Sequence, residues 1–119
     1  MKALVVDDSA VMRKVLVGAL NRADITDVDQ AGDGAAAVQA VGQSDYEIIL
    51  MDWNMPNMLG IDAVRAIRAA GKTMPIIMVT TEAEKSRVVE AIKAGANNYI
   101  IKPFEPQTII SKIQEAMAV

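Results

Sequence analysis

Hydrophobic residues recur along the chain at two different spacings. Short, nearly continuous apolar runs are typical of strands that are buried on both faces of a sheet. Apolar residues three and four positions apart are typical of helices with one buried side. The short runs predict strands at Ala3–Val6, Ile25–Ala31, Glu47–Met51, Pro75–Val79 and Asn97–Ile101. The helical spacing predicts helices at Ala10–Ala23, Ala35–Val41, Ile61–Ala70, Glu82–Ala94 and Pro106–Met117.

Strands and helices alternate along the chain, which indicates right-handed βαβ units and an α/β fold with one parallel sheet covered on both faces. Ile25–Ala31 has the weakest strand pattern and is expected at an edge of that sheet. Gly42 is expected to end the second helix. Val88, Val89 and Ile92 are expected on one side of the fourth helix.

Composition narrows the classes of function that the chain can have. It has 119 residues, of which 52% are hydrophobic, so it is large and apolar enough to bury the core of one domain. Because it has neither cysteine nor histidine, it cannot form disulfides, thiolate or histidine metal sites, or a Ser-His-Asp triad. The net charge of −3 argues against a nucleic-acid partner. No apolar run approaches the ~18–20 residues that span a membrane, and no signal-peptide pattern is present, so we expect a cytoplasmic protein without membrane insertion.

Polar residues follow most of the predicted strands. In a parallel sheet all carboxyl ends lie at one edge, where ligands bind in open α/β folds. The residues expected at this edge are Asp7 and Asp8 after the first strand, Asp52 and Asn54 after the third, Thr80 and Thr81 after the fourth, and Lys102 after the fifth.

This set of residues indicates phosphoryl chemistry assisted by a metal ion. Carboxylates held close together repel one another, and a divalent cation relieves that repulsion. Oxygen ligands without nitrogen or sulfur suit Mg²⁺. A carboxylate such as Asp52 can also act as a nucleophile and form an aspartyl phosphate, which requires a metal, a cation and further donors around the phosphoryl group. Asp7 and Asp8 are candidates to hold the metal, Lys102 to supply the cation, and Thr80 to act as a donor.

The chain resembles a known family over its whole length. The matching segments are Val5–Ser9, Met51–Pro56, Val79–Glu82, Ala94–Ala96, Tyr99 and Lys102–Phe104. In this order they resemble the receiver domains of two-component response regulators, most of all the stand-alone CheY-type chemotaxis regulators. The resemblance implies a doubly wound, flavodoxin-like (βα)5 sandwich of three layers, with a parallel five-stranded sheet in the order 2-1-3-4-5. We expect a single receiver domain over residues 1–119, without an output domain.

The resemblance also implies roles for the residues at the sheet edge. Asp52 is the phosphoacceptor in a reaction that depends on Mg²⁺. The ion is bound by Asp7, Asp8, Asp52 and the backbone carbonyl of Asn54. Lys102 contacts the phosphoryl group, and the peptide bond that follows Lys102 is cis.

Further residues are implied to control the switch. Thr80 moves to hydrogen-bond a phosphoryl oxygen, and Tyr99 follows it inward. Asn54 and Glu82 stand where the family tunes the water that hydrolyses the aspartyl phosphate. Thr81 departs from the family, in which this position is often Ala or Gly. We hypothesise that its β-branched side chain narrows access to the phosphoacceptor and slows phosphorylation.

The partners implied by the resemblance are proteins. A histidine kinase donates the phosphoryl group, and a phosphatase removes it beside slow autodephosphorylation. The downstream target, for which a flagellar motor switch protein is the candidate, binds the face formed by the helix Glu82–Ala94, the fifth strand and the last helix. We expect a monomeric phosphoacceptor signalling protein that catalyses its own phosphorylation, not an enzyme. The residues equally permit a stand-alone phosphorelay intermediate or a receiver in a pathway other than chemotaxis.

Taken singly, the same residues have structural explanations. Asp8 or Ser9 can cap the first helix, Lys102 can be a solvated lysine, and Trp53 can lie over the rim of the site. Gly32–Ala37 fits the dinucleotide-binding pattern G-x-G-x-x-A but follows the second strand, so we interpret it as a turn into a helix. A hydrolase of the haloacid dehalogenase kind would need D-x-D after the first strand, where this chain has Asp-Asp-Ser. A flavodoxin-like or nucleotide-binding module would need a phosphate loop, and the sequence has no P-loop.

Overall fold

The computed structural model of the protein describes residues 2–118. Its strands are β1 (Lys2–Val6), β2 (Asp27–Ala31), β3 (Ile48–Met51), β4 (Ile76–Thr80) and β5 (Asn98–Ile101). Its helices are α1 (Ala10–Arg22), α2 (Gly34–Gln43), α3 (Gly60–Ala69), α4 (Lys85–Ala94) and α5 (Pro106–Met117). The strands form one parallel sheet in the order β2-β1-β3-β4-β5. The predicted fold class and strand order are therefore confirmed, and β2 lies at an edge as expected.

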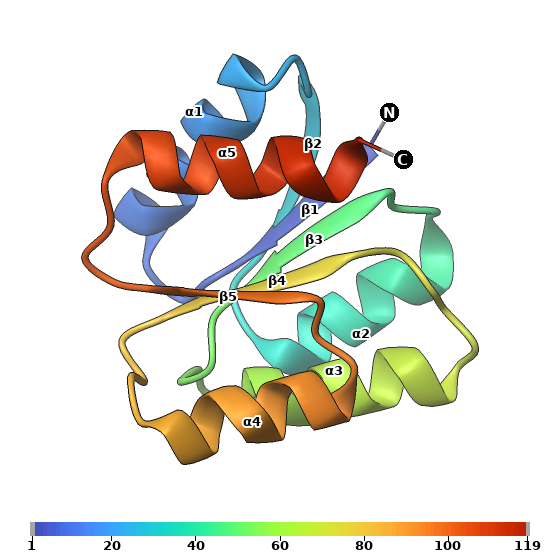
Figure 1. Cartoon of the computed structure of the whole chain (residues 1–119). Helices are drawn as coiled ribbons and strands as arrows, with labels where there is room; N and C mark the ends of the chain where they lie inside the picture. Colours follow the sequence, from blue (N-terminus) through green and yellow to red (C-terminus); the bar gives the residue numbers. More distant parts are fainter. Residues whose placement is uncertain (1, 119) are drawn as a thin grey trace.

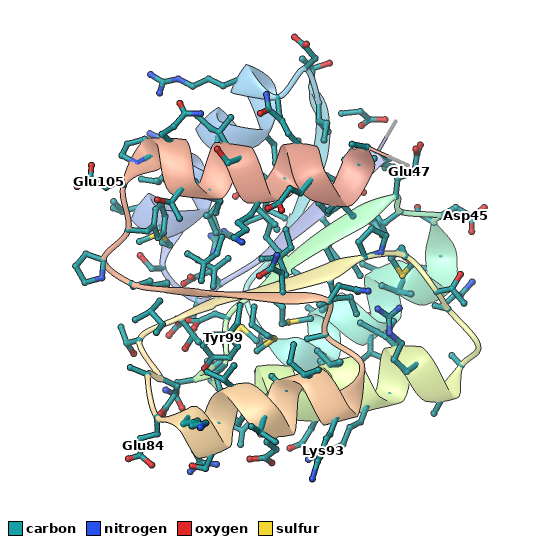
Figure 2. All side chains as sticks on the ribbon, in the orientation of Figure 1. Asp45, Glu47, Glu84, Lys93, Tyr99 and Glu105 are labelled. Carbon is teal, nitrogen blue, oxygen red and sulfur yellow. The ribbon has the colours of Figure 1, made fainter. Side chains whose placement is uncertain are left out.

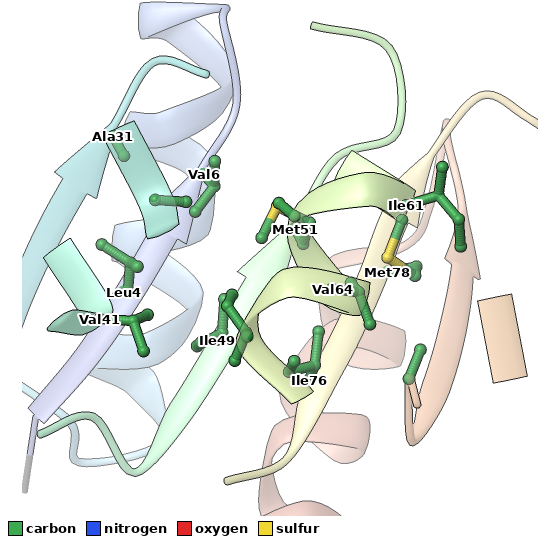
Figure 3. Close-up of a cluster of buried hydrophobic side chains, with 14 of the residues drawn as sticks. Leu4, Val6, Ala31, Val41, Ile49, Met51, Ile61, Val64, Ile76 and Met78 are labelled. Carbon is green, nitrogen blue, oxygen red and sulfur yellow. The ribbon is translucent and has the colours of Figure 1, made fainter. Parts of the chain in front are cut away.

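The molecule has three layers, with α1 and α5 on one face of the sheet and α2, α3 and α4 on the other (Figure 1). Successive strand residues point to opposite faces, so the core is divided into two clusters. Figure 3 shows the cluster under α2, α3 and α4, where alternate residues such as Leu4, Ile49 and Ile76 are fully buried. Their neighbours Val5 and Leu50 point into the cluster under α1 and α5. Each such side chain contributes about 1.5–3 kcal/mol through burial.

Two capped helix starts hold the loops at the carboxyl edge of the sheet. Ser9 is the N-cap of α1, where its hydroxyl accepts the amide of Met12 at 3.2 Å. Asp33 is the N-cap of α2, where its carboxylate accepts the amide of Ala36 at 2.7 Å. Gly32–Ala37 is therefore a turn into a helix, as the sequence predicts. Within residues 2–118 no helix is long and apolar enough to span a membrane.

The prediction that Gly42 ends the second helix is wrong. Helix α2 runs through Gly42 to Gln43, and Ser44 is its C-cap. A glycine inside a helix costs only about 1 kcal/mol relative to alanine. The helix continues past Gly42 because the amide of Ser44 donates to the carbonyl of Ala40 at 3.0 Å.

Helix α4 begins at Lys85, not at Glu82 as predicted. The reason is that both backbone groups of Glu82 are engaged by the end of the sheet. Its amide donates to the Thr80 hydroxyl at 3.3 Å, and its carbonyl accepts the Tyr99 hydroxyl at 2.6 Å. Glu82 is thereby held in the loop between β4 and α4.

The apolar stripe predicted on α4 faces outward in part. Val89 and Ile92 are 44% and 48% exposed, whereas Ala91 is fully buried against the sheet. Ile101, on the edge strand β5, is 44% exposed as well. The side of α4 and β5 away from the core therefore presents apolar side chains to the surroundings.

Candidate functional site

The register of the sheet aligns the residues that follow the strands. Val6 of β1 pairs with Met51 of β3, so Asp7 and Asp52 leave neighbouring strands at the same level. Thr80, the last residue of β4, pairs with the last residue of β5, which directly precedes Lys102. The amide of Asp52 also donates to the carbonyl of Val6 at 2.9 Å. The sequence prediction that these residues meet at one edge is confirmed.

Two buried carboxylates share one lysine at this edge. The ammonium of Lys102 is 2.7 Å from Asp7 Oδ2 and 3.4 Å from Asp52 Oδ2. The second oxygen of each carboxylate accepts a backbone amide, from Ser9 at 2.9 Å for Asp7 and from Trp53 at 2.7 Å for Asp52. Asp7 and Asp52 are only 1% and 7% exposed. One oxygen of each is therefore fixed by the backbone, while the other faces the shared cation.

A third carboxylate completes a cluster that could hold a metal ion. Asp7, Asp8 and Asp52 each have one carboxylate oxygen within 4.8 Å of the others. Asp8 is exposed, so the cluster opens to solvent on its side. A donor set made only of oxygens fits a hard divalent cation such as Mg²⁺. Asn54, two residues after Asp52, is exposed, and its amide donates to Glu82 Oε1 at 2.9 Å.

The surroundings of Asp52 act on its pKa in opposite directions. Burial is the largest effect and raises the pKa of Asp52 above its ordinary value. The ammonium of Lys102 lowers the pKa and the negative charge of Asp7 raises it. The Trp53 amide and the Thr80 hydroxyl favour the charged form. The net effect on the pKa of Asp52 is upward because the cost of burying the charged form outweighs the contacts that favour it.

The loop after β4 lies beside this cluster. The hydroxyl-bearing side chain of Thr80 is fully buried, whereas its neighbour Thr81 is exposed. Figure 2 shows Tyr99 on the side of β5 that faces α4. The Tyr99 hydroxyl donates to the Glu82 carbonyl, and burial raises the pKa of Tyr99 to about 12. Thr80, Glu82 and Tyr99 therefore form one connected group next to Asp52.

The chain also matches a known protein family. The family model for the response regulator receiver domain matches residues 3–114 of the chain. The chain belongs to this family.

Relatives of this receiver domain cover almost all of it. Chemotaxis protein CheY1 of Helicobacter pylori strain J99 is 45% identical over 117 residues, which are 96% of this chain and 94% of the relative. A chemotaxis protein CheY homolog of Campylobacter jejuni strain 81-176 is 45% identical over 120 residues, which cover 98% and 92%. The solved structure of Vibrio cholerae chemotaxis protein CheY4 has a TM-score of 0.88 at 34% identity and covers 97% of both chains.

The chain that follows Asp52 packs back against the Asp52 backbone at Gly60. A Cβ atom at Gly60 would overlap the carbonyl oxygen of Asp52, so only glycine fits there. Gly60 also donates its amide to the Trp53 carbonyl at 2.8 Å. Leu59, the N-cap residue of α3, makes no side-chain capping bond. The peptide bond after Lys102 is cis, as the family resemblance implies.

The sequence suggested that Trp53 lies over the rim of the site, but the structure places it elsewhere. Its ring is 2% exposed and belongs to the core cluster under α2, α3 and α4. The chain crosses from β3 to α3 through residues 52–59, none of which is helical, and Trp53 packs into the core along this crossing. The guanidinium of Arg87 lies 5.4 Å from the centre of the ring. No sequence signal separates Arg87 from the other charged residues of α4.

Proposed function

We propose that the protein is a cytoplasmic, monomeric phosphorylation-activated switch in chemotaxis signalling, with Asp52 as its phosphoacceptor. Membership of the receiver family implies a histidine kinase as phosphodonor and a protein target downstream. The observation that carries the assignment of Asp52 is its place at the end of β3, with one oxygen facing Lys102 and two further carboxylates close by.

In this mechanism Asp7, Asp8, Asp52 and the backbone carbonyl of Asn54 hold Mg²⁺, which neutralises charge on the phosphoryl oxygens when bound. Asp52 Oδ2 attacks the phosphorus of a phosphohistidine, so that an O–P bond forms, the N–P bond breaks and the imidazole leaves. The Trp53 amide donates to Oδ1 of Asp52, which leaves Oδ2 of Asp52 for the attack. Since the chain itself supplies these groups, a small acyl phosphate serves as an alternative donor.

Lys102 and Thr80 stabilise the transferred group. Lys102 already contacts Oδ2 of Asp52, so a short movement away from Asp7 brings its ammonium to a phosphoryl oxygen. Thr80 accepts a hydrogen bond from the Glu82 amide, and its hydroxyl, which favours the charged form of Asp52, would donate to the phosphoryl group instead. A positive charge and a hydroxyl donor on the phosphoryl group lower the barrier by electrostatic stabilisation.

Phosphorylation adds a charge of about −1.5 to −2 beside Thr80, and this charge drives the switch. Movement of Thr80 toward the phosphoryl group changes the loop that also holds Tyr99. The result is a shift between two conformations of the face formed by α4, β5 and α5, toward the conformation that the phosphoryl group favours. The exposed Val89, Ile92 and Ile101 make that face a suitable apolar surface for a protein target, with a flagellar motor switch protein as the candidate.

The bond between Asn54 and Glu82 bears on how long the signal lasts. The Asn54 amide donates to Glu82 Oε1 at 2.9 Å, and Asn54 stands two residues after Asp52. A water that attacks the aspartyl phosphate must pass or be held by these two groups. We expect them, together with Thr81 at the rim, to set the slow autodephosphorylation rate, and a phosphatase to shorten the lifetime further.

The proposal is tested by incubating the protein with acetyl phosphate and Mg²⁺ and measuring its intact mass. The wild type is expected to gain one phosphoryl group, and chelation of the metal is expected to prevent it. Asp52→Asn is expected to remain unmodified, while Asp62→Asn on the exposed side of α3 serves as the matched control. Normal labelling of Asp52→Asn would show that the phosphoacceptor is another residue.

A further inference from the structure

Arg13 reaches back from α1 to the acidic loop that precedes the helix. Its Nη1 donates to the backbone carbonyl of Asp7 at 2.7 Å. Its Nε donates to Gln30 Oε1, at the end of β2, at 3.0 Å. The neighbouring cation Lys14 is exposed and lines the groove between α1 and α5 instead. Arg13 is therefore the basic residue of α1 that is tied to the candidate metal site.

The carbonyl that Arg13 holds belongs to the peptide between two of the metal-site carboxylates, Asp7 and Asp8. A peptide unit is planar, so a fixed carbonyl oxygen also fixes the amide of Asp8 and the direction in which the next Cα leaves. The other groups of Asp7 are held separately, because its amide donates to the Ala31 carbonyl at 3.1 Å. Its carboxylate is held by the contacts to Ser9 and Lys102 described above. The orientation of Asp8 relative to Asp7 thus depends on the contact that Arg13 makes.

We propose that Arg13 is a positioning residue for the Mg²⁺ site, which orients the Asp7–Asp8 peptide so that both carboxylates point at one ion. This inference rests on the proposed function, since it takes the cluster to be the metal site. Arg13 does not touch the ion. It acts through the backbone, as residues around metal ligands commonly do.

Two features make an arginine suited to this position. The guanidinium is planar and carries donors at fixed angles, so one side chain reaches the Asp7 carbonyl and Gln30 together. Its positive charge also offsets part of the repulsion among the carboxylates. A lysine at the same place retains the charge, but all its N–H donors lie on one nitrogen atom. A glutamine retains neither the charge nor the length.

The test compares the Mg²⁺ affinity of unphosphorylated variants by isothermal titration calorimetry. Arg13→Gln is expected to weaken Mg²⁺ binding by about 10- to 100-fold, the range typical of residues that orient metal ligands. Arg13→Lys is expected to lie between Arg13→Gln and the wild type. Lys14→Gln removes the same charge one residue away, and its affinity is expected to stay within about twofold of the wild type because solvent and salt screen an exposed charge.

A second measurement separates positioning of ligands from general support of the fold. Thermal unfolding of each variant is recorded without divalent metal, and phosphorylation by acetyl phosphate is followed as a function of Mg²⁺. For Arg13→Lys the rate at saturating Mg²⁺ is expected to return to that of the wild type, because only the affinity is impaired. Wild-type Mg²⁺ affinity in both Arg13 variants, with or without a lowered melting temperature, would overturn the inference while leaving the proposed function intact. A wild-type protein that binds no Mg²⁺ would overturn both.

Discussion

Lys102 is the cation that contacts both buried carboxylates of the site. Its ammonium is closer to Asp7 than to Asp52, at 2.7 Å against 3.4 Å. On the proposed function, a cation bound at the acidic cluster would compete for the oxygens of Asp7 and weaken that stronger contact. Metal binding would then free the lysine for a phosphoryl group on Asp52.

Thr81 is expected to slow phosphorylation through its shape. It is exposed at the rim of the site, directly after the buried Thr80. Thr81→Ala is expected to raise the rate of phosphorylation by acetyl phosphate about two- to fivefold, which corresponds to roughly 0.4–1 kcal/mol of the barrier. Thr81→Val keeps the β-branched bulk without the hydroxyl and is the control, with a rate near that of the wild type. An alanine variant that is equal to or slower than the wild type would contradict this explanation.

Tyr46 is expected to make the stability of the protein fall at alkaline pH. Its hydroxyl donates to Asp29 Oδ2 at 2.6 Å, and burial raises its pKa to about 12, from 10 in the unfolded chain. Because the folded state favours the protonated phenol, the stabilisation is complete below pH 10 and is lost between pH 10 and 12. Tyr99 behaves in the same way.

The contribution of Tyr46 can be isolated with Tyr46→Phe. Denaturant unfolding of the wild type and the variant at several pH values is expected to show a shallower alkaline decline in the variant. The difference is expected to be about 1.36 kcal/mol for each pH unit of the interval, because one phenol no longer titrates. Parallel declines would show that the Tyr46 phenol has the same pKa in both states.

At the scale of elements, the number, type and succession along the chain of the helices and strands follow from the sequence, but their boundaries follow only to within about three residues. Apolar spacing distinguishes helices from strands, and it is a property of each segment alone. The start of α4, for example, depends on Tyr99 binding the carbonyl of Glu82. Such contacts join distant segments, so the boundaries that they fix cannot be predicted from the local sequence.

Two glycines are expected to respond to alanine in opposite ways. Gly42 lies in α2 with open space where a side chain would be, so Gly42→Ala is expected to raise the free energy of unfolding by up to about 1 kcal/mol. At Gly60 a side chain would collide with the backbone of Asp52, so Gly60→Ala is expected to lower it by about 1–3 kcal/mol and to impair phosphorylation. Denaturant unfolding and the mass assay measure the two effects. A stabilising Gly60→Ala would mean that the loop can move away from Asp52 without cost.

At the scale of the whole molecule, the sequence places the parts of the site but not their connections. Asp7, Asp52 and Lys102 could be assigned to one edge because parallel strands share a direction. The contact of Arg13 with the Asp7 backbone and the burial of Trp53 could not, since both depend on where a long or bulky side chain turns after its Cα is placed.

The folded molecule as a whole is expected to be stabilised by Mg²⁺. Only the folded chain brings Asp7, Asp8 and Asp52 together, so binding adds to the free energy of unfolding by mass action. At about 100 times the dissociation constant the gain is expected to be ~2.7 kcal/mol. Asp8→Asn is expected to be insensitive to Mg²⁺ and more stable than the wild type without metal, because one repelling charge is gone. Chemical unfolding at constant ionic strength, with K⁺ replacing Mg²⁺, measures this. An equal response of variant and wild type would remove Asp8 from the ligand set.

The ion pair between Lys102 and Asp7 joins positions 95 residues apart in the chain. During synthesis on the ribosome, Asp7 and Asp8 emerge well before the ammonium that compensates them. Until β5 joins the sheet, the incomplete domain carries a concentrated negative charge with no lysine among its carboxylates. The acidic cluster therefore gains its compensating cation only when β5 has joined the sheet.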